Sequence, residues 1–336
     1  MIAVFGAGAI GCWVGGRLAA GGAEVTLIGR ARVLGELAGG LRTSELGGRE
    51  AVAAIGAGAG GIRVATDAEA ARGARLVLVT VKSAQTADAG AALAKVLPEG
   101  AVVVSLQNGV RNADVLRAAL PGRRVLAAMV PFNVIRRGPG AYHRASAGVL
   151  RVDDDPAAAP LLAACAAAAL PIESRGDMAA VQWAKLVLNL NNAINALSGL
   201  PLAAELARRP YRRCLAASQR EALGLLEAAR LPVAKLTAIP PRWMPRLLDT
   251  PDRVFGVLAR RVVAIDPGAR SSMWDDLEAR RPTEIDHLQG EVVALARRVG
   301  RSAPIAGGLV QLVRAAEGGG RRDFSGDELV AALGVP

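Results

Sequence analysis

The chain contains few cysteines, histidines and aromatic residues. Among its 336 residues are three cysteines at wide spacing and only two histidines. Because there is no Cys-x-x-Cys pair and no histidine cluster, the sequence predicts neither a disulfide framework nor a transition-metal site. With four tryptophans, two tyrosines and four phenylalanines, the core must be built mainly from alanine, valine and leucine. Redox chemistry in this chain would therefore need an organic cofactor.

Long uninterrupted apolar segments are also absent from the sequence. No stretch of ~18 residues has the composition of a bilayer span. A secretory signal has basic residues before its apolar segment. No basic residue precedes the apolar run at the N-terminus of this sequence. We therefore expect a cytoplasmic protein with no membrane partner. The apolar content of 52% and the charged content of 21% argue against disorder, and the length suggests roughly two domains.

Lysine is scarce although the chain is basic. Lys and Arg total 41 against 30 Asp and Glu, which gives a net charge of +11. The arginines are spread along the chain, and we interpret the densest group, at residues 208–213, as a solvated helix end, so the sequence does not predict a nucleic-acid partner. A desolvated lysine can lose its proton at usable pH, whereas an arginine cannot. The candidates for acid–base chemistry are therefore the four lysines, Lys82, Lys95, Lys185 and Lys235.

The N-terminal segment predicts a strand, a glycine turn, a helix and a second strand. The strands fall at residues 2–5 and 24–28, and the turn carries Gly-x-Gly-x-x-Gly. In this context the first glycine permits a tight turn, the second lets a pyrophosphate approach the backbone, and the third lets the helix pack closely on the strand. The same expression recurs at residues 56–61, but no helix follows it, and we interpret that copy as a surface hairpin. The expected dinucleotide contacts are Gly6, Gly8, Ala9, Ile10 and Gly11.

The end of the second strand carries a basic residue. Gly29 and Arg30, with Arg32 close by, stand where NAD-binding proteins usually have Asp or Glu for the ribose 2′-hydroxyl. A guanidinium group can form bidentate, charge-assisted hydrogen bonds with a 2′-phosphate. The sequence therefore favours NADP(H) over NAD(H); the alternative interpretation makes Arg30 one more residue of an Arg-rich surface.

Three further apolar runs, at residues 76–81, 101–106 and 125–130, alternate with Ala-rich helical stretches, as in the βαβ units of a parallel sheet. We predict an α/β protein whose first domain, residues 1–174, is a Rossmann-type doubly wound parallel sheet. Ligands of such sheets bind beyond the carboxyl ends of the strands. Polar residues follow two strands at that position, which predicts a cofactor site near Lys82, Gln107 and Asn108.

The second domain, predicted over residues 175–336, is helical almost to its end. Its most informative residues are Lys185, Asn189 and Asn192, whose spacing predicts that they share one face of a helix. Asparagine is a poor helix former, and four asparagines between residues 189 and 195 favour a binding site. A polar packing network between helices is the alternative interpretation.

A second polar group lies further along the same domain, at residues 270–276 and 281–287. Thr283-x-x-Asp286 resembles a helix-capping box, so we expect Thr283 to begin a helix. Glu284 and Ser272 are candidates for a substrate site.

Together these motifs resemble those of the ketopantoate reductase family, the 2-dehydropantoate 2-reductases. The resemblance covers essentially the whole chain. It rests on six separated motifs in the family's order: Gly6-x-Gly8-x-x-Gly11, Val81-Lys82-Ser83, Leu106-Gln107-Asn108-Gly109, Lys185-x-x-x-Asn189, Ser271-Ser272-Met273 and Thr283-Glu284-Ile285-Asp286. The resemblance implies NADPH-dependent reduction of 2-dehydropantoate to (R)-pantoate, in pantothenate and coenzyme A biosynthesis, with the active site in the cleft between a Rossmann domain and a helical domain.

The family's catalytic and cofactor-binding roles carry over by position. The resemblance implies that Lys185 is the catalytic lysine, which donates the proton, and that Glu284 is the acidic residue that assists it. It implies that Asn108 lies near both cofactor and substrate and that Lys82 lies near the nicotinamide.

The substrate-binding roles carry over less completely. Asn189 and Ser272 match substrate-binding positions of the family, whereas Asn192 and Asn195 compete for one further asparagine position. The stretch between residues 200 and 270 looks longer than in compact family members, and residues 131–133 differ from the small residues expected there. These departures leave the 2-oxo acid open.

Two other functions remain open at this point. One is a reductase of the same superfamily that acts on a different 2-oxo acid or on a β-hydroxyacid, and the other is a regulatory protein that binds NADP(H) without turnover. The apolar helical domain also makes a homodimer possible.

Overall fold

The computed structural model describes residues 1–56, 58, 60–262 and 268–335, without the side chains of residues 258–262. The chain divides into two compact units, Met1–Met178 and Ala179–Pro336. We refer to them as unit 1 and unit 2 and describe each by itself. The division falls four residues beyond the end of the domain expected at residue 174.

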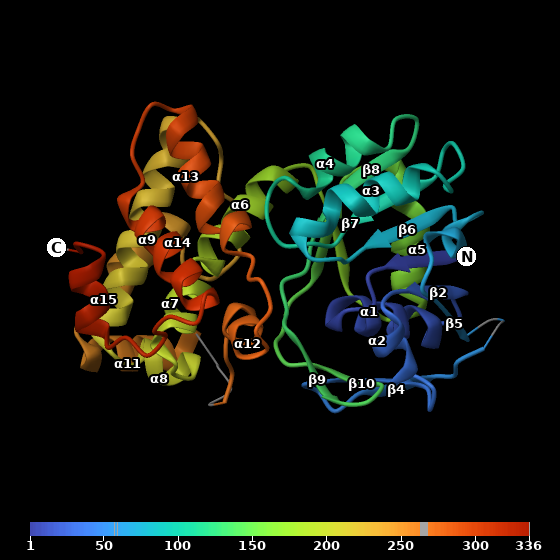
Figure 1. Ribbon diagram of the computed structural model, residues 1–336, viewed down its shortest axis with the longest axis horizontal. Coiled ribbons are helices and arrows are strands. Elements are labelled where there is room, and N and C mark those ends of the chain that lie inside the picture. Colours follow the sequence, from blue (N-terminus) through green and yellow to red (C-terminus); the bar gives the residue numbers. More distant parts are fainter. Residues whose placement is uncertain (57, 59, 263–267, 336) are drawn as a thin grey trace. The chain divides into compact units, whose positions relative to one another are not determined.

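Unit 1 is built on an eight-stranded sheet (Figure 1). Its strand order is β12-β11-β8-β7-β6-β1-β2-β5. The strands are β1 (Ile2–Phe5), β2 (Val25–Ile28), β5 (Ile62–Ala65), β6 (Leu76–Val79), β7 (Val102–Ser105), β8 (Arg124–Met129), β11 (Leu150–Asp153) and β12 (Ile172–Arg175). In this sheet order, each pair of neighbouring strands between β5 and β8 is parallel, whereas β11 is antiparallel to β8. β1, β2, β6 and β7 are buried along their length, except for half-buried Phe5, which explains their continuous apolar sequences.

The strand order of unit 1 determines which face of the sheet its connecting helices cover. They are α1 (Ala9–Ala20), α2 (Ala31–Gly35), α3 (Thr86–Ala94), α4 (Asn112–Ala119) and α5 (Ala159–Ala167), with short 3₁₀ turns η1 (Ala68–Ala71), η2 (Ser83–Gln85) and η3 (Pro156–Ala158). The chain runs outward from β1 to β2 on one side and from β6 to β7 on the other. Because such crossovers are right-handed, α1 and α3 cover opposite faces of the sheet. The predicted α/β fold class is confirmed.

A four-stranded sheet of order β4-β3-β10-β9 packs on α1. It consists of β3 (Leu41–Glu45), β4 (Glu50–Ala53), β9 (Val134–Gly138) and β10 (Ala141–Arg144), and Figure 1 shows the early, blue strands beside the later, green ones. The hairpin expected around residues 56–61 is wrong. β4 belongs to this small sheet, whereas β5 pairs in parallel with β2, so the second glycine motif lies in a connection between two sheets; its residues 57 and 59 lie outside the described part.

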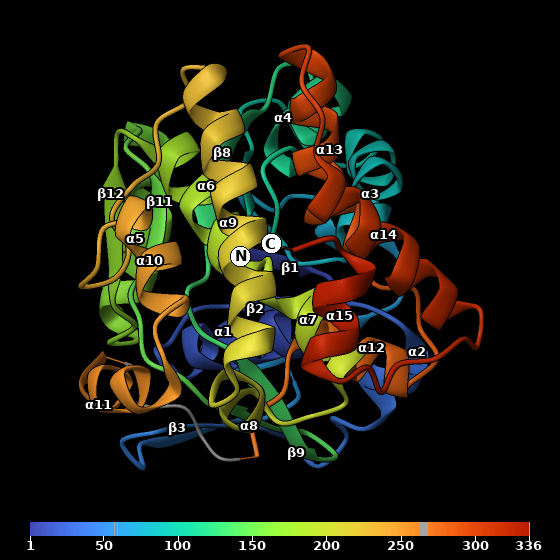
Figure 2. The ribbon, with the colours of Figure 1, turned by 90° about the vertical axis from the view of Figure 1, so that its left-hand side faces the viewer.

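Every element described in unit 2 is a helix, as predicted. The helices are α6 (Met178–Asn189, which begins one residue earlier), α7 (Asn191–Ser198), α8 (Leu202–Leu206), α9 (Arg209–Ala228), α10 (Met244–Leu248), α11 (Asp252–Val262), α12 (Ser272–Glu278), α13 (Gln289–Arg298), α14 (Pro304–Glu317) and α15 (Gly326–Ala332), with 3₁₀ turns η4 (Pro241–Trp243) and η5 (Ile285–His287). Figure 2 shows α9, in yellow, running lengthwise with α10 on one side and α13, α14 and α15 on the other. The helix α9 is therefore the centre of this unit. No helix in the described ranges is long and apolar enough to cross a bilayer.

The arginine-rich start of α9 is not simply the solvated helix end that its composition suggests. Arg212 is fully buried. Its guanidinium group donates to the carbonyl oxygens of Leu248 and Thr250 at 2.9 and 2.7 Å, and it forms a 2.9 Å ion pair with Asp252. Carbonyl groups at the last residue of α10 and just beyond it thus accept hydrogen bonds from a charge that would otherwise be costly to bury.

Candidate active site

The glycine turn after β1 has the geometry that a dinucleotide site requires. Gly6 has φ +122°, and a Cβ there would lie 2.6 Å from the backbone nitrogen of Val81, while a Cβ on Gly11 would overlap the carbonyl oxygen of Gly6. Both glycines are therefore required by chain packing. A Cβ on Gly8, in contrast, would have no neighbour within 4 Å. Space is open at Gly8, and the first turn of α1 carries no acidic residue, so this helix N-terminus fits an anionic pyrophosphate.

Arg30 immediately precedes α2, at the carboxyl end of β2. Its side chain is exposed, and the first turn of α2 has no acidic residue. The preceding Gly29 packs against Ala7: a Cβ on Gly29 would lie 2.5 Å from that of Ala7. An Asp or Glu at position 29 is therefore excluded by packing, and Arg30 is the side chain that this strand end presents.

The loops that follow β6 and β7 are joined by a buried polar network. Asn112 donates to the hydroxyl of Ser83 at 3.1 Å and to the carbonyl oxygen of Asn108 at 2.5 Å. Thr86 donates to the side-chain oxygen of Asn112 at 2.7 Å and accepts from Gln107 at 2.7 Å. Thr86 and Asn112 could not be selected from the sequence, because they lie 26 positions apart and become neighbours only where the two loops meet.

The side chain of Gln107, a predicted cofactor-binding residue, is part of this network. This side chain is buried and also donates to the carbonyl oxygen of Val81 at 3.0 Å. Its hydrogen-bonding groups are thus directed into the protein, because they satisfy backbone and hydroxyl groups that would otherwise be buried without partners. Gln107 holds the two loops together. Lys82, in contrast, is exposed, and Asn108 is half-buried, so these two side chains are accessible beside the network.

Lys185 and Asn189 lie on α6, four residues apart and both half-buried. They therefore share one helix face, as expected. Burial lowers the pKa of the Lys185 amine to about 8. The predicted continuation to Asn192 on the same helix is wrong, because α6 ends at Asn189 and α7 begins at Asn191.

Asn192 and Asn195 have different environments on α7. Asn195 is fully buried and uses its side chain for contacts within unit 2. Asn192 is half-buried, and its backbone carbonyl accepts a hydrogen bond from the hydroxyl of Ser271 at 3.1 Å. Because α12 packs on α7 and Ser272 is its exposed first residue, this packing places Ser272 near Asn192.

Glu284 is half-buried and immediately precedes the 3₁₀ turn η5. The hydroxyl of Thr283 accepts from the backbone N–H of Ile285 at 3.2 Å. The N-cap residue of η5 is nevertheless Glu284, so the expected start at Thr283 is wrong by one residue. The capping box expected with Asp286 does not form, because η5 is short and the Asp286 carboxylate pairs with Arg314 at 2.6 Å.

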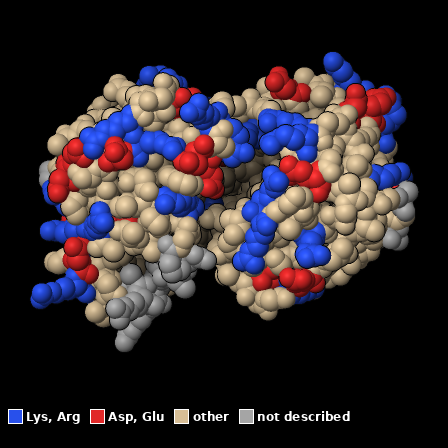
Figure 3. Space-filling view, turned by 60° about the horizontal axis from the view of Figure 1, so that its bottom comes forward, with Lys and Arg blue, Asp and Glu red and all other residues tan. Residues whose placement is uncertain are grey.

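Charged side chains are mixed on the face that Figure 3 shows, where basic residues alternate with acidic and uncharged ones on each unit. Both units contain ion pairs between exposed side chains, for example Arg117 with Asp114 at 2.7 Å and Arg321 with Glu328 at 2.7 Å.

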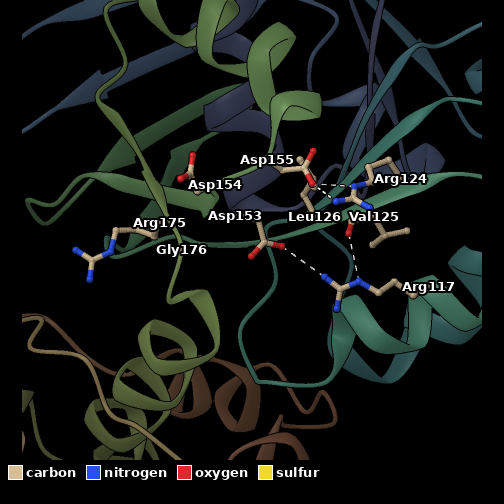
Figure 4. Close-up of a pocket in the computed structure, with 9 residues that line it drawn as sticks. All are labelled: Arg117, Arg124, Val125, Leu126, Asp153, Asp154, Asp155, Arg175 and Gly176. Atoms are coloured by element: carbon tan, nitrogen blue, oxygen red, sulfur yellow. Dashed lines mark hydrogen bonds and ion pairs between the residues drawn. The ribbon is translucent and has the colours of Figure 1, made fainter.

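A pocket of about 220 Å³ lies away from the predicted residues, in unit 1. Figure 4 shows that Arg117 points toward Asp153, at 3.4 Å, and that Arg124 pairs with Asp155. Arg124 begins β8 and Asp153 ends β11, whereas Arg117 lies on α4. The pocket is therefore at the opposite end of the parallel strands from the glycine turn. Its arginines and aspartates neutralise one another, so this pocket offers no clear charge preference to a ligand.

Within each unit, the structure thus brings predicted residues together. Unit 1 presents the glycine turn, Arg30, Lys82 and Asn108 at the carboxyl ends of its parallel strands. Unit 2 carries a lysine of lowered pKa together with half-buried asparagines. Fold and site define a class: an oxidoreductase that depends on a nicotinamide dinucleotide.

Comparisons with known proteins narrow this class to a family. The family described as ketopantoate reductase PanE/ApbA matches residues 2–156, and its C-terminal counterpart matches residues 177–317. The chain belongs to the ketopantoate reductase family.

Individual relatives agree with this assignment. A 2-dehydropantoate 2-reductase of Halobacterium salinarum is 30% identical, over 94% of this chain and 98% of that protein. The crystal structure of a PanE/ApbA family ketopantoate reductase from Ralstonia eutropha is similar with a TM-score of 0.80 and 31% identity, over 95% of this chain and 98% of the other. D-mandelate dehydrogenase in complex with NADH and anilino(oxo)acetate has a TM-score of 0.77 at 19% identity, over 95% and 98% of the two chains, and shows similarity of fold.

Proposed function

We propose that this protein reduces 2-dehydropantoate to (R)-pantoate with NADPH, in pantothenate and coenzyme A biosynthesis. The observation that carries the proposal is the burial of Lys185, which lowers the pKa of its amine to about 8, on the same helix face as Asn189. An amine of this pKa is largely protonated at neutral pH and yet gives up its proton more readily than an ordinary lysine. The family assignment supports the same reaction.

In the proposed mechanism, NADPH would be held by the glycine turn and Arg30 of unit 1, and it would supply the hydride that the carbonyl carbon of the 2-oxo acid accepts. Negative charge then develops on the carbonyl oxygen, and Lys185 Nζ donates a proton to it, so that the product is a secondary alcohol. The lysine is left neutral and takes a new proton from solvent. Glu284 is assigned to keep this amine protonated between turnovers.

The polar residues around Lys185 are assigned to the substrate. Asn189, Asn192 and Ser272 would orient its hydroxyl and carboxylate groups, which fits the half-buried or exposed state of all three. We assign the further asparagine position to Asn192, because the side chain of Asn195 is committed to internal hydrogen bonds. Asn108 is assigned to the region shared by cofactor and substrate.

The cofactor is assigned to unit 1 and the substrate to unit 2. Gly6, Gly8 and Gly11 fit a pyrophosphate, and Arg30 fits a 2′-phosphate because it is cationic, exposed and not neutralised by a nearby acidic residue of α2. Lys82 is assigned to the nicotinamide end of the cofactor.

A substrate panel tests the proposal. NADPH oxidation is followed by absorbance with 2-dehydropantoate and with other branched or bulky 2-oxo acids. For a β-hydroxyacid the reverse reaction is followed, as the formation of NADPH from NADP⁺. The proposal predicts the highest kcat/KM for 2-dehydropantoate. A clear preference for another 2-oxo acid would assign the chain to a different reductase activity, whereas NADPH binding without any turnover would support a regulatory role.

A further inference from the structure

The helix α8 of unit 2 carries a carboxyl group in a fully buried position. Glu205 is 0% exposed. Its Oε2 accepts hydrogen bonds from the side-chain amides of Asn195, at 2.7 Å, and Asn191, at 3.4 Å, whereas its Oε1 has no hydrogen-bond partner in the described part of the chain. Burial raises the pKa of this carboxyl to about 8. A buried polar atom without a partner is costly, and an apolar side chain of similar volume would avoid that cost.

Asn195, the nearest partner of Glu205, has a fully used side chain. Its Nδ2 donates to the carbonyl oxygen of Leu200 at 2.9 Å as well as to Glu205, and its Oδ1 accepts from the backbone N–H of Ser271 at 2.9 Å. The two acceptors face the NH₂ group and the one donor faces the carbonyl oxygen, so the three hydrogen bonds fix the orientation of the Asn195 amide. Without the carboxyl, only Leu200 would hold the NH₂ group in place.

Ser271, which Asn195 holds, connects two elements of the proposed substrate site. Its hydroxyl donates to the carbonyl oxygen of Asn192 on α7 at 3.1 Å and accepts from the backbone N–H of Trp274 at 3.1 Å, which caps α12. Ser272 follows as the first residue of that helix. The hydrogen bonds therefore run from Glu205 through Asn195 to the residue that sets the spacing between Asn192 and Ser272.

We propose that Glu205 is a positioning residue for the substrate: it orients Asn195, which fixes the start of α12 against α7 and so places Ser272 relative to Asn192. This inference rests on the proposed function, because it takes Asn192 and Ser272 as substrate-binding residues. Glu205 itself contacts neither substrate nor cofactor. It acts through Asn195 and Ser271, and it therefore affects the binding of the 2-oxo acid rather than that of the dinucleotide.

Three substitutions of Glu205 separate this role from packing. Glu205→Gln keeps the volume and an oxygen that can accept from Asn195. Glu205→Asp moves the acceptor oxygen away from Asn195 because its side chain is one methylene shorter. Glu205→Met has a similar volume but no acceptor oxygen. The KM for the 2-oxo acid should be the same in Glu205→Gln as in the wild type. It should be higher in Glu205→Asp and highest in Glu205→Met, where we expect a rise of about tenfold. The expected change in kcat is smaller, and the KM for NADPH is unchanged.

Glu221 on α9 provides a matched control. Its partly buried carboxylate accepts from the backbone N–H groups of Ile305 and Ala306 at 2.9 and 2.8 Å, at the start of α14, and neither α9 nor α14 carries a proposed substrate residue. Glu221→Met is expected to lower the temperature of unfolding and leave the KM for the 2-oxo acid unchanged. Equal KM values in Glu205→Met, Glu205→Asp and wild type would overturn the positioning role.

Amide hydrogen exchange supplies a readout that needs no substrate. In the unliganded protein, the backbone amides of Ser271 and Trp274 should exchange faster in Glu205→Met and Glu205→Asp than in Glu205→Gln, at equal global stability. Unchanged exchange at these amides would also overturn the inference. If the parent protein reduces no 2-oxo acid, the proposed function fails, while this measurement still decides whether Glu205 positions the start of α12.

Discussion

The side-chain amide of Gln289 donates a 2.9 Å hydrogen bond to the backbone carbonyl oxygen of Leu190. Leu190 is the single residue between α6 and α7, and Gln289 is the fully buried first residue of α13. Glu284 lies five positions before Gln289. This one hydrogen bond therefore links the segment that carries Glu284 to the helix break that separates Lys185 from Asn192.

Gln289→Met should disturb this link without creating a cavity. We expect kcat/KM to fall about tenfold, because a small displacement of Glu284 relative to Lys185 weakens both charge stabilisation and proton transfer. Gln219→Met is the control: Gln219 is also buried and donates to the carbonyl of Val187 on α6 at 3.3 Å, but it lies on α9. Steady-state kinetics of both variants, with thermal unfolding as the check on folding, decide the matter. Equal losses of activity would mean that the Glu284 segment is not the sensitive one.

Lys185→Met tests the proton donor directly. We expect kcat/KM for the 2-oxo acid to fall by at least about 10²-fold, the usual effect of removing a positioned acid. NADPH affinity, measured by fluorescence titration, should stay close to that of the parent, because the expected dinucleotide contacts are residues of unit 1. Turnover near the parental rate would refute the assignment of Lys185.

The pH dependence of kcat/KM follows from the pKa of Lys185. Because the amine must be protonated to act as an acid, and because burial lowers its pKa to about 8, kcat/KM should be level below that pH and fall above it. Burial raises the pKa of the Glu205 carboxyl to about 8 as well, so this group titrates in the same range. Glu205→Gln separates the two, and its profile should still fall above about pH 8 if Lys185 is the titrating group. A level profile in that variant would assign the pH dependence to Glu205.

The main sheet was predictable because each central strand is a continuous apolar run between turn signals. The runs at residues 2–5 and 76–81 correspond to β1 and β6 within two residues. The small sheet was not predicted. Its strands are short and partly polar, and β10 pairs with β3, so that His143 lies opposite Ser44, 99 positions earlier in the chain. Pairing over such a separation leaves no local pattern.

The residue types of the candidate site could be selected from the sequence, but their arrangement could not. No glycine or proline marks the helix break at Leu190, and its buried partner Gln289 comes from another helix. The proposed choice of Asn192 over Asn195 also rests on contacts that the sequence does not show, because those of Asn195 come from α8 and from the turn before α12. The long-range hydrogen bonds around the expected residues therefore could not be predicted from the sequence.

Arg30→Ala tests the preference for NADPH. Loss of a charge-assisted contact with the 2′-phosphate should raise the KM for NADPH about tenfold or more and leave that for NADH nearly unchanged. Arg298→Ala, an exposed arginine at the end of α13, removes the same charge from unit 2 and controls for net charge. Equal KM values for NADPH and NADH in the parent protein would remove the basis of this prediction.

Gly8 and Gly11 belong to one motif, yet we expect substitution at Gly8 to lower cofactor affinity and substitution at Gly11 to lower folding stability. Gly8 has φ −82° and ψ −173°, an extended conformation open to any residue, and a Cβ there meets nothing within 4 Å. Gly8→Ala should therefore fold with a stability within about 0.5 kcal/mol of the parent. Because the new methyl group would occupy the space proposed for the pyrophosphate, the affinity for NADPH should fall at least about tenfold.

Gly11→Ala is the contrasting variant, since its Cβ would overlap the carbonyl oxygen of Gly6. It should lose about 1–3 kcal/mol of unfolding free energy through overpacking, and it should lose cofactor affinity only as a consequence of the distorted turn. Denaturant unfolding and NADPH titration of both variants give a two-by-two comparison. If Gly8→Ala binds NADPH as tightly as the parent, the open space beside Gly8 does not hold the pyrophosphate, and the proposed cofactor site at the start of α1 is wrong.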